Sequence, residues 1–85
     1  MVLIESQSKN ITGNGASYRE ANYNVAKDGY TFIGVGGWSV GNVEYNLNCI
    51  KKNGQLYVMA QRINGATWSG ALNFGVEIIY QKNSW

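Results

Sequence analysis

The chain has 85 residues, 45% of them hydrophobic and 14% charged, which is the composition of a folded protein with room for one domain, residues 1–85. It contains no histidine and one cysteine, Cys49, so catalysis by imidazole, an intrachain disulfide and a Cys/His zinc site within one chain are excluded. The net charge is only +2 and the basic residues are spread along the chain, which argues against a nucleic-acid partner.

The sequence also lacks the segments that direct a chain into a membrane. No apolar run approaches the roughly 18 residues of a spanning helix. The start, Met1-Val2-Leu3-Ile4-Glu5, has no basic region ahead of its short apolar run, as a signal peptide would. We therefore expect no membrane insertion. Because a domain this small has a marginal core without a metal or disulfide, we expect a homo-oligomer, or one module of a longer protein.

The first half of the chain predicts two strands. From Glu20 to Val25, polar and apolar residues alternate, which is the period of a strand with one buried face. The segment 30–35 carries bulky residues on both faces, so we expect it to lie centrally in a sheet or against a partner. The glycines of Gly34-Val35-Gly36-Gly37 follow without a helix pattern that could complete a phosphate-binding loop. They predict a bulge or a packing notch.

The second half predicts three more strands. Apolar and polar residues alternate from Val43 to Cys49 and, over the longest run, from Ala71 to Tyr80. Between them, Asn53-Gly54 predicts a type I′ hairpin leading into 56–60, another segment that is bulky on both faces. The spacing of turns indicates an all-β fold, a small antiparallel β-sandwich of jelly-roll-like type with about six or seven strands.

The string from Gly29 to Trp38, Gly-Tyr-Thr-Phe-Ile-Gly-Val-Gly-Gly-Trp, resembles a segment of small β-sandwich domains near the C-termini of bacteriophage tail-fibre and minor structural proteins. Gly-Tyr-Thr, a branched residue followed by glycine, and Gly-Trp recur there in this order. The lead Val25–Asp28, a later turn with Trp68 and the strand 76–80 agree with this pattern. The resemblance implies a virion-associated module, commonly a homotrimer, that touches the bacterial surface.

Four asparagines and one tryptophan are the candidate ligand contacts. Amide groups on an outer sheet face can orient the hydroxyls of a cell-surface glycan, and these amides are Asn22, Asn24, Asn46 and Asn48. Trp68 lies in the loop 64–70 and is predicted to be the most exposed aromatic, serving ligand contact, subunit contact or edge packing. Trp38 is predicted to be core. Tyr18, Tyr57 and Trp85 are further rings that could face a sugar.

The sequence does not favour an enzyme. The carboxyl groups are Glu5, Glu20, Asp28, Glu44 and Glu77. Of these, Glu20 and Glu44 could be neighbours across a sheet, but solvated surface carboxylates are far commoner than a catalytic pair. Without histidine, a serine nucleophile would need a lysine base, and Cys49 is predicted to be a buried, inert thiol. Asp28 stands alone in its turn, so neither a metal nor a cofactor is expected.

Two functions follow as hypotheses. The first is a non-enzymatic phage structural and adhesion module, located in the virion, that trimerises and presents loops to a host-surface glycan. The second is a monomeric carbohydrate-binding or protein-interaction module. The two hypotheses differ in the mass that the protein should have in solution.

Overall fold

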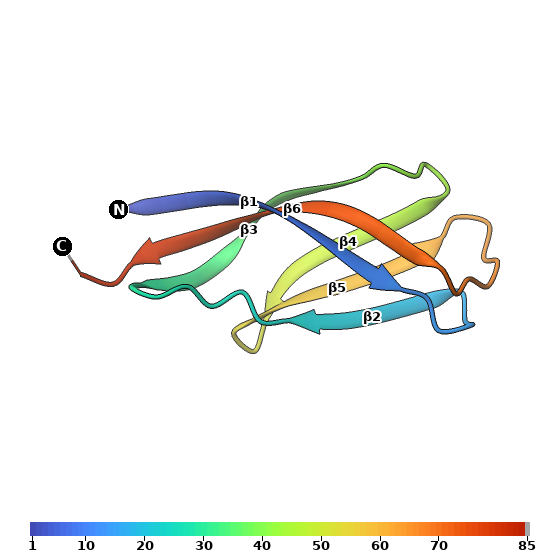
Figure 1. Cartoon of the computed structure of the whole chain (residues 1–85), viewed down its shortest axis with the longest axis horizontal. Coiled ribbons are helices and arrows are strands. Elements are labelled where there is room, and N and C mark those ends of the chain that lie inside the picture. Colours follow the sequence, from blue (N-terminus) through green and yellow to red (C-terminus); the bar gives the residue numbers. More distant parts are fainter. Residues whose placement is uncertain (85) are drawn as a thin grey trace.

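The computed structural model describes residues 1–84, which fold into six antiparallel β-strands joined by loops (Figure 1). They are β1 (Val2–Thr12), β2 (Tyr18–Tyr23), β3 (Tyr30–Val40), β4 (Tyr45–Lys52), β5 (Gln55–Arg62) and β6 (Ala71–Lys82). One sheet has the order β1-β6-β3 and the other β2-β5-β4. The predicted all-β sandwich is confirmed.

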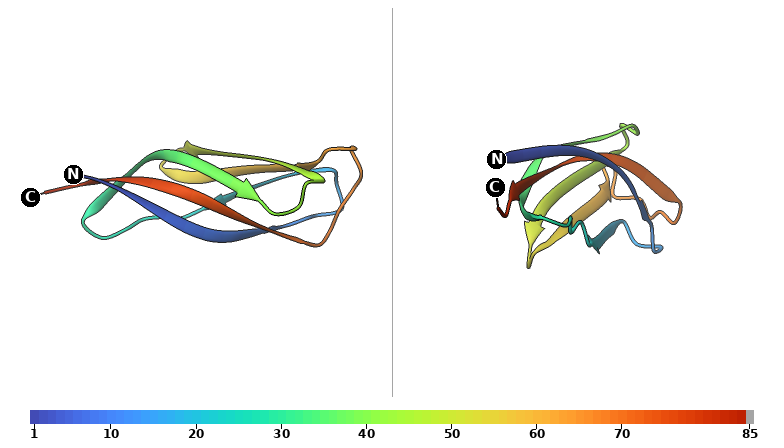
Figure 2. Two further views of the ribbon diagram at one scale, coloured as in Figure 1. Left: turned by 90° about the horizontal axis from the view of Figure 1, so that it is seen from above. Right: turned by 60° about the vertical axis from the view of Figure 1, so that its left-hand side comes forward.

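The two sheets stack as layers of an elongated body (Figure 2). Its principal extents are 49 × 21 × 15 Å. The chain changes sheet after every strand except β4, which pairs with β5 through a tight hairpin. In that hairpin Asn53 and Gly54 have φ of 53° and 75°, the positive values that a type I′ turn requires, so the predicted hairpin is confirmed. Residues 1–84 contain no helix that could span a membrane.

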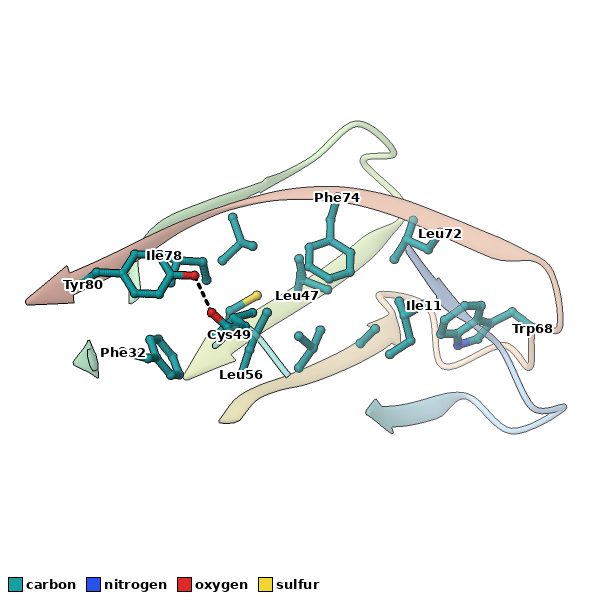
Figure 3. Close-up of a cluster of buried hydrophobic side chains, with 14 residues drawn as sticks. Ile11, Phe32, Leu47, Cys49, Leu56, Trp68, Leu72, Phe74, Ile78 and Tyr80 are labelled. Carbon is teal, nitrogen blue, oxygen red and sulfur yellow. Dashed lines mark hydrogen bonds between the residues drawn. The ribbon is translucent and has the colours of Figure 1, made fainter. Parts of the chain in front are cut away.

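The core is filled by every second side chain of the facing strands (Figure 3). On β6 these are Leu72, Phe74, Val76, Ile78 and Tyr80, none more than 5% exposed. The opposite layer contributes Leu47, Cys49, Leu56, Val58 and Ala60. The hydroxyl of Tyr80 donates to the carbonyl of Val25 at 2.5 Å, so this buried polar group keeps a partner. The predicted inward positions of 71–80 and of Leu47 and Cys49 are confirmed.

The strand β3 differs from its prediction. It lies at the edge of its sheet rather than centrally, and Thr31 and Ile33 are exposed. Its pairing with β6 shifts register between Phe32 and Gly34 and again between Val35 and Gly37, so the bulge predicted from the glycines is confirmed. Phe32 faces the core while Ile33, on the other side of the strand, is 46% exposed, so no partner within residues 1–84 covers the second bulky face.

Two other expectations need correction. Val43 is 86% exposed and precedes β4, because the turn at Asn42 delays the start of the strand. The strand β1 was not expected, since its inward positions include Glu5, Gln7 and Lys9, which hide the alternation. By contrast, the segment 56–60 does lie on a central strand, β5, as predicted.

Candidate ligand-binding face

The outer face of the β2-β5-β4 sheet gathers most of the predicted contact residues. The pairing register sets three rows across this face: Tyr18, Gln61 and Asn46; Glu20, Met59 and Asn48; Asn22, Tyr57 and Ile50. We call these nine residues the binding face. Asn22, Asn46 and Asn48 are all exposed on it. Amides from two strands, one from β2 and two from β4, thus share one surface, because alternate side chains of a strand point to the same face.

Glu20 is the centre of a hydrogen-bond cluster on the binding face. The hydroxyl of Tyr18 donates to Oε2 of Glu20 at 2.8 Å, and the hydroxyl of Tyr57 donates to the same oxygen. Tyr18 lies two residues before Glu20 on β2, whereas Tyr57 arrives from β5, diagonally across the sheet. The ammonium of Lys52 lies 4.4 Å from the centre of the Tyr57 ring, which holds that ring in place by a cation–π contact.

These hydrogen bonds fix the protonation states of the cluster. The donated bonds from Tyr57, first, and from Tyr18 lower the pKa of Glu20 below its ordinary value of 4.5. The same carboxylate raises the pKa of Tyr57 and of Tyr18. At neutral pH the face therefore presents a carboxylate and two phenol hydroxyls. Both hydroxyls bond Oε2, so within residues 1–84 the other oxygen, Oε1, stays available to a ligand donor.

A shallow hollow of about 120 Å³ opens beside this cluster. Tyr18, Asn46, Asn48, Met59 and Gln61 line it. Its volume is below that of a pocket that encloses a whole small molecule. The hollow suits one edge of a sugar ring that leaves its other side in solvent.

Asn24 is not part of the binding face. It follows the end of β2, and its Oδ1 accepts a hydrogen bond from the backbone N–H of Ala26 at 2.9 Å. This is the geometry by which asparagine closes a local turn. The strand therefore ends at Tyr23, two residues earlier than predicted, although Val25 is still buried as the alternation predicted.

The prediction that Trp68 is exposed is wrong. Its side chain is only 6% exposed, its Nε1 donates to the carbonyl of Ser17 at 2.9 Å, and its ring meets Tyr45 edge to face at 5.2 Å. Figure 3 shows the indole closing one end of the core beside Ile11 and Leu72. Of the three roles predicted for Trp68, edge packing is the one that its surroundings match.

Trp38 and Trp85 are the other two tryptophans of the chain. Trp38 was expected in the core but is 41% exposed, because it lies on the edge strand β3. Trp85 lies outside the described residues. The remaining exposed ring on the binding face is Tyr18, at 43%.

The opposite outer face, on the β1-β6-β3 sheet, is hollowed more broadly. Two adjoining hollows of about 510 and 320 Å³ lie over Ser8, Ser39 and Gly75. Small side chains meet there across three strands, and Asn10, Asn73 and Glu77 also line the two hollows. We place the candidate site on the β2-β5-β4 face, at the hollow of about 120 Å³ that adjoins the hydrogen-bonded cluster of Glu20, Tyr18 and Tyr57.

The geometry separates the carboxyl groups that could have formed a catalytic pair. Glu20 lies in the row of Asn48, whereas Glu44 precedes β4 and binds Arg62 at 3.1 Å. The four residues from Glu44 to Asn48 correspond to about 13 Å along a strand, beyond the roughly 5 to 10 Å that glycosidases use. Cys49 is 1% exposed and burial raises its pKa to about 12, so its thiol is not a nucleophile. Within residues 1–84, no three potential metal ligands cluster.

No protein-family model, no curated protein and no solved structure matches this chain. The resemblance of residues 29–38 to phage tail proteins therefore stays a prediction, and functional inference depends on the geometry of the site.

Proposed function

We propose that this protein is a non-enzymatic binding module whose β2-β5-β4 face takes a hydroxyl-rich ligand of the glycan type. One observation carries the proposal: the ionised, doubly hydrogen-bonded Glu20 shares an exposed sheet face with Asn22, Asn46 and Asn48. Carboxylates accept hydrogen bonds and amides both donate and accept them, which are the interactions that sugar hydroxyls need.

The binding face has the polarity that a sugar requires. A ligand hydroxyl can donate to Oε1 of Glu20 while a second hydroxyl bonds the amide of Asn48, two strand pairings away across Met59. The exposed ring of Tyr18 supplies an apolar surface for the C–H side of a sugar. These groups project from paired strands, so little conformational entropy is lost when they bind.

The ligand should bind weakly to one copy of the site. The hollow is shallow, and most of a bound sugar would stay in solvent. Useful attachment to a surface then requires several sites acting together. In the phage setting suggested by residues 29–38, the module sits on a virion appendage and the ligand is a host-surface glycan.

Binding to a printed array of bacterial surface polysaccharides tests the proposal. We expect wild-type protein to bind some of them, and Glu20→Gln and Asn48→Ala to reduce that binding about tenfold, the loss expected for one good hydrogen bond to a charged or polar group. Asn73→Ala is the matched control, because Asn73 is an exposed asparagine on the opposite outer face and should bind unchanged. Absence of wild-type binding, or an equal loss in all three variants, would overturn the proposal.

A protein-interaction module is the second candidate, and one observation favours it. At one end of the sandwich Val43 and Ile63 are 86% and 60% exposed and line a hollow of about 250 Å³. Adjacent exposed apolar residues are typical of protein contacts. Peptides selected from a display library on wild-type protein should fail to bind Val43→Ser/Ile63→Ser if this patch is the site. Peptides that still bind the double variant would remove it.

A further inference from the structure

The N-terminal half of β1 has backbone groups that no strand of the chain uses. β1 pairs with β6 without a register shift from Val2 to Thr12. At the two ends of this ladder, Lys82 N–H donates to Met1 C=O and Gly13 N–H donates to Gly70 C=O, both at 2.9 Å. Since hydrogen-bonded pairs alternate along an antiparallel ladder, the odd-numbered residues of β1 bond β6. The even-numbered residues direct their N–H and C=O groups to the free edge.

Side chains of β2 close only the C-terminal half of this edge. The Tyr23 hydroxyl donates to the Asn10 carbonyl at 2.6 Å, and Nε of Arg19 donates to the Thr12 carbonyl at 2.9 Å. Figure 1 shows this end of β1 approaching β2, whereas its N-terminal half lies away from that strand. Within residues 1–84, no backbone group outside the β1–β6 ladder bonds Ile4, Ser6 or Ser8. Three residues therefore offer a ready template for another strand.

The other three edges are protected. β2 has only 6 residues, and β3 is interrupted by two register shifts. β4 ends in Lys51 and Lys52 and lies beside β3 of the other sheet. Short strands, bulges and lysines are the features that prevent edges from pairing. The N-terminal half of β1 is therefore the edge that is left open.

The charge of Glu5 favours one register for pairing this edge with a second copy of the chain. In a two-fold antiparallel pair the even residues must bond even residues, and the open stretch Val2–Ser8 allows centres at residues 4, 5 and 6. A centre at Glu5 opposes two carboxylates, each with Lys27 of its own chain at 3.2 Å, and a centre at Ile4 places Glu5 against Leu3. A centre at Ser6 places Glu5 against Gln7 of the second copy, twice. Gln7 donates to Glu5 within one chain at 2.9 Å and to the Tyr80 hydroxyl at 3.1 Å, so in this register each Glu5 faces a neutral amide of the kind that it already binds.

We propose that two copies of this chain join antiparallel along Ile4–Ser8, with the two Ser6 residues facing each other on the two-fold axis. Ser6 bonds Ser6, and Ile4 bonds Ser8 of the second copy, so the two β1-β6-β3 sheets become one continuous sheet. This assembly is a dimer and differs from the trimer that the phage resemblance implies. The pairing does not depend on any ligand.

The dimer would give the binding face a second role. The two-fold axis of an antiparallel strand pair is perpendicular to the sheet, so both β2-β5-β4 layers lie on the same side of the continuous sheet. Both binding faces then point in one direction. If the proposed glycan function holds, the dimer engages a flat surface through two sites at once, which offsets the weak affinity of each site.

Cysteine cross-linking tests the register. Under mild oxidation Ser6→Cys should form a disulfide-linked dimer, because Cα atoms of a hydrogen-bonded antiparallel pair lie about 5.5 Å apart, within the range of a disulfide. Ser8→Cys is the matched control on the same strand and face. Its two copies would lie four residues apart along the pair, about 13 Å, and should not cross-link. The native Cys49 is buried and adds no background.

A mixture of Ile4→Cys and Ser8→Cys should cross-link as a heterodimer, because the proposed register places these residues opposite each other. Wild-type protein should sediment at twice the chain mass at micromolar concentration, without ligand. A monomeric or trimeric mass would overturn the proposal, as would equal cross-linking of Ser6→Cys and Ser8→Cys. These readouts involve no glycan, so their failure is separate from a failure of the array experiment.

Discussion

The burial of Trp38 and Trp68 is the reverse of what their local sequence suggests. Trp68 lies in a loop between glycines yet is 6% exposed, whereas Trp38 lies within a strand and is 41% exposed. The difference arises from the paths of the two segments. The loop from β5 to β6 crosses between the sheets and carries its indole over the open end of the core, while β3 runs along an edge. In a sandwich of two three-stranded layers, position relative to the layers decides burial more than secondary structure does.

Replacing each tryptophan by alanine should give the largest difference in stability between the two positions. We expect Trp68→Ala to lower the free energy of unfolding by about 3 to 5 kcal/mol, because it removes a buried ring and leaves a cavity beside Tyr45. Trp38→Ala should cost about 1 kcal/mol or less. Equilibrium urea unfolding of both variants measures this difference. Equal losses would show that the two rings are buried alike.

Gly13 offers a finer test of the packing around Trp68. A Cβ built there would lie 2.5 Å from the Trp68 carbonyl oxygen and 2.6 Å from its ring. Gly13→Ala must therefore move the indole or the strand end, and we expect a loss of about 1 to 3 kcal/mol. Gly70→Ala serves as the control, because no atom lies within 4 Å of its added Cβ. A stable Gly13→Ala protein would mean that the indole packs more loosely.

The smallest expected effect concerns the exposed cluster at Glu20. Its pKa is lowered in the folded protein by the Tyr57 and Tyr18 hydroxyls, so the stabilisation is complete above its ordinary value of 4.5 and is lost as pH falls through the lowered value. The stability difference between wild type and Glu20→Gln should therefore shrink as acid is added. Tyr57→Phe, which removes the largest cause, should weaken this pH dependence. A difference that grows below pH 4.5 would contradict the assigned direction.

Local patterns predicted the parts of the fold that local interactions specify. The alternation of 71–80 and the Asn53-Gly54 turn depend on neighbouring residues alone, and both are confirmed. The strand β1 escaped prediction because an edge strand tolerates Glu5, Gln7 and Lys9 at inward positions that solvent still reaches. The burial of Trp68 escaped it because a crossing loop carries no period.

The candidate site was predictable to a similar degree. Period two placed Asn22, Asn46 and Asn48 on outer faces, and the structure brings all three onto one sheet. The bond between Tyr57 and Glu20 was missed because it depends on how β2 is registered on β5. The signal that was available is the spacing of Tyr18 and Glu20, which places both on one side of a strand.

Chemical-shift perturbation during titration with a bacterial surface polysaccharide tests the central claim most directly. The proposed site predicts that the amide signals of Glu20, Asn46 and Asn48 move together as the polysaccharide is added. The signals of Ser8, Ser39 and Gly75, on the opposite face, should stay in place. Shifts confined to those three residues would contradict the assignment of the binding face. So would a polysaccharide that the protein binds on the array but that leaves the amide signal of Glu20 in place.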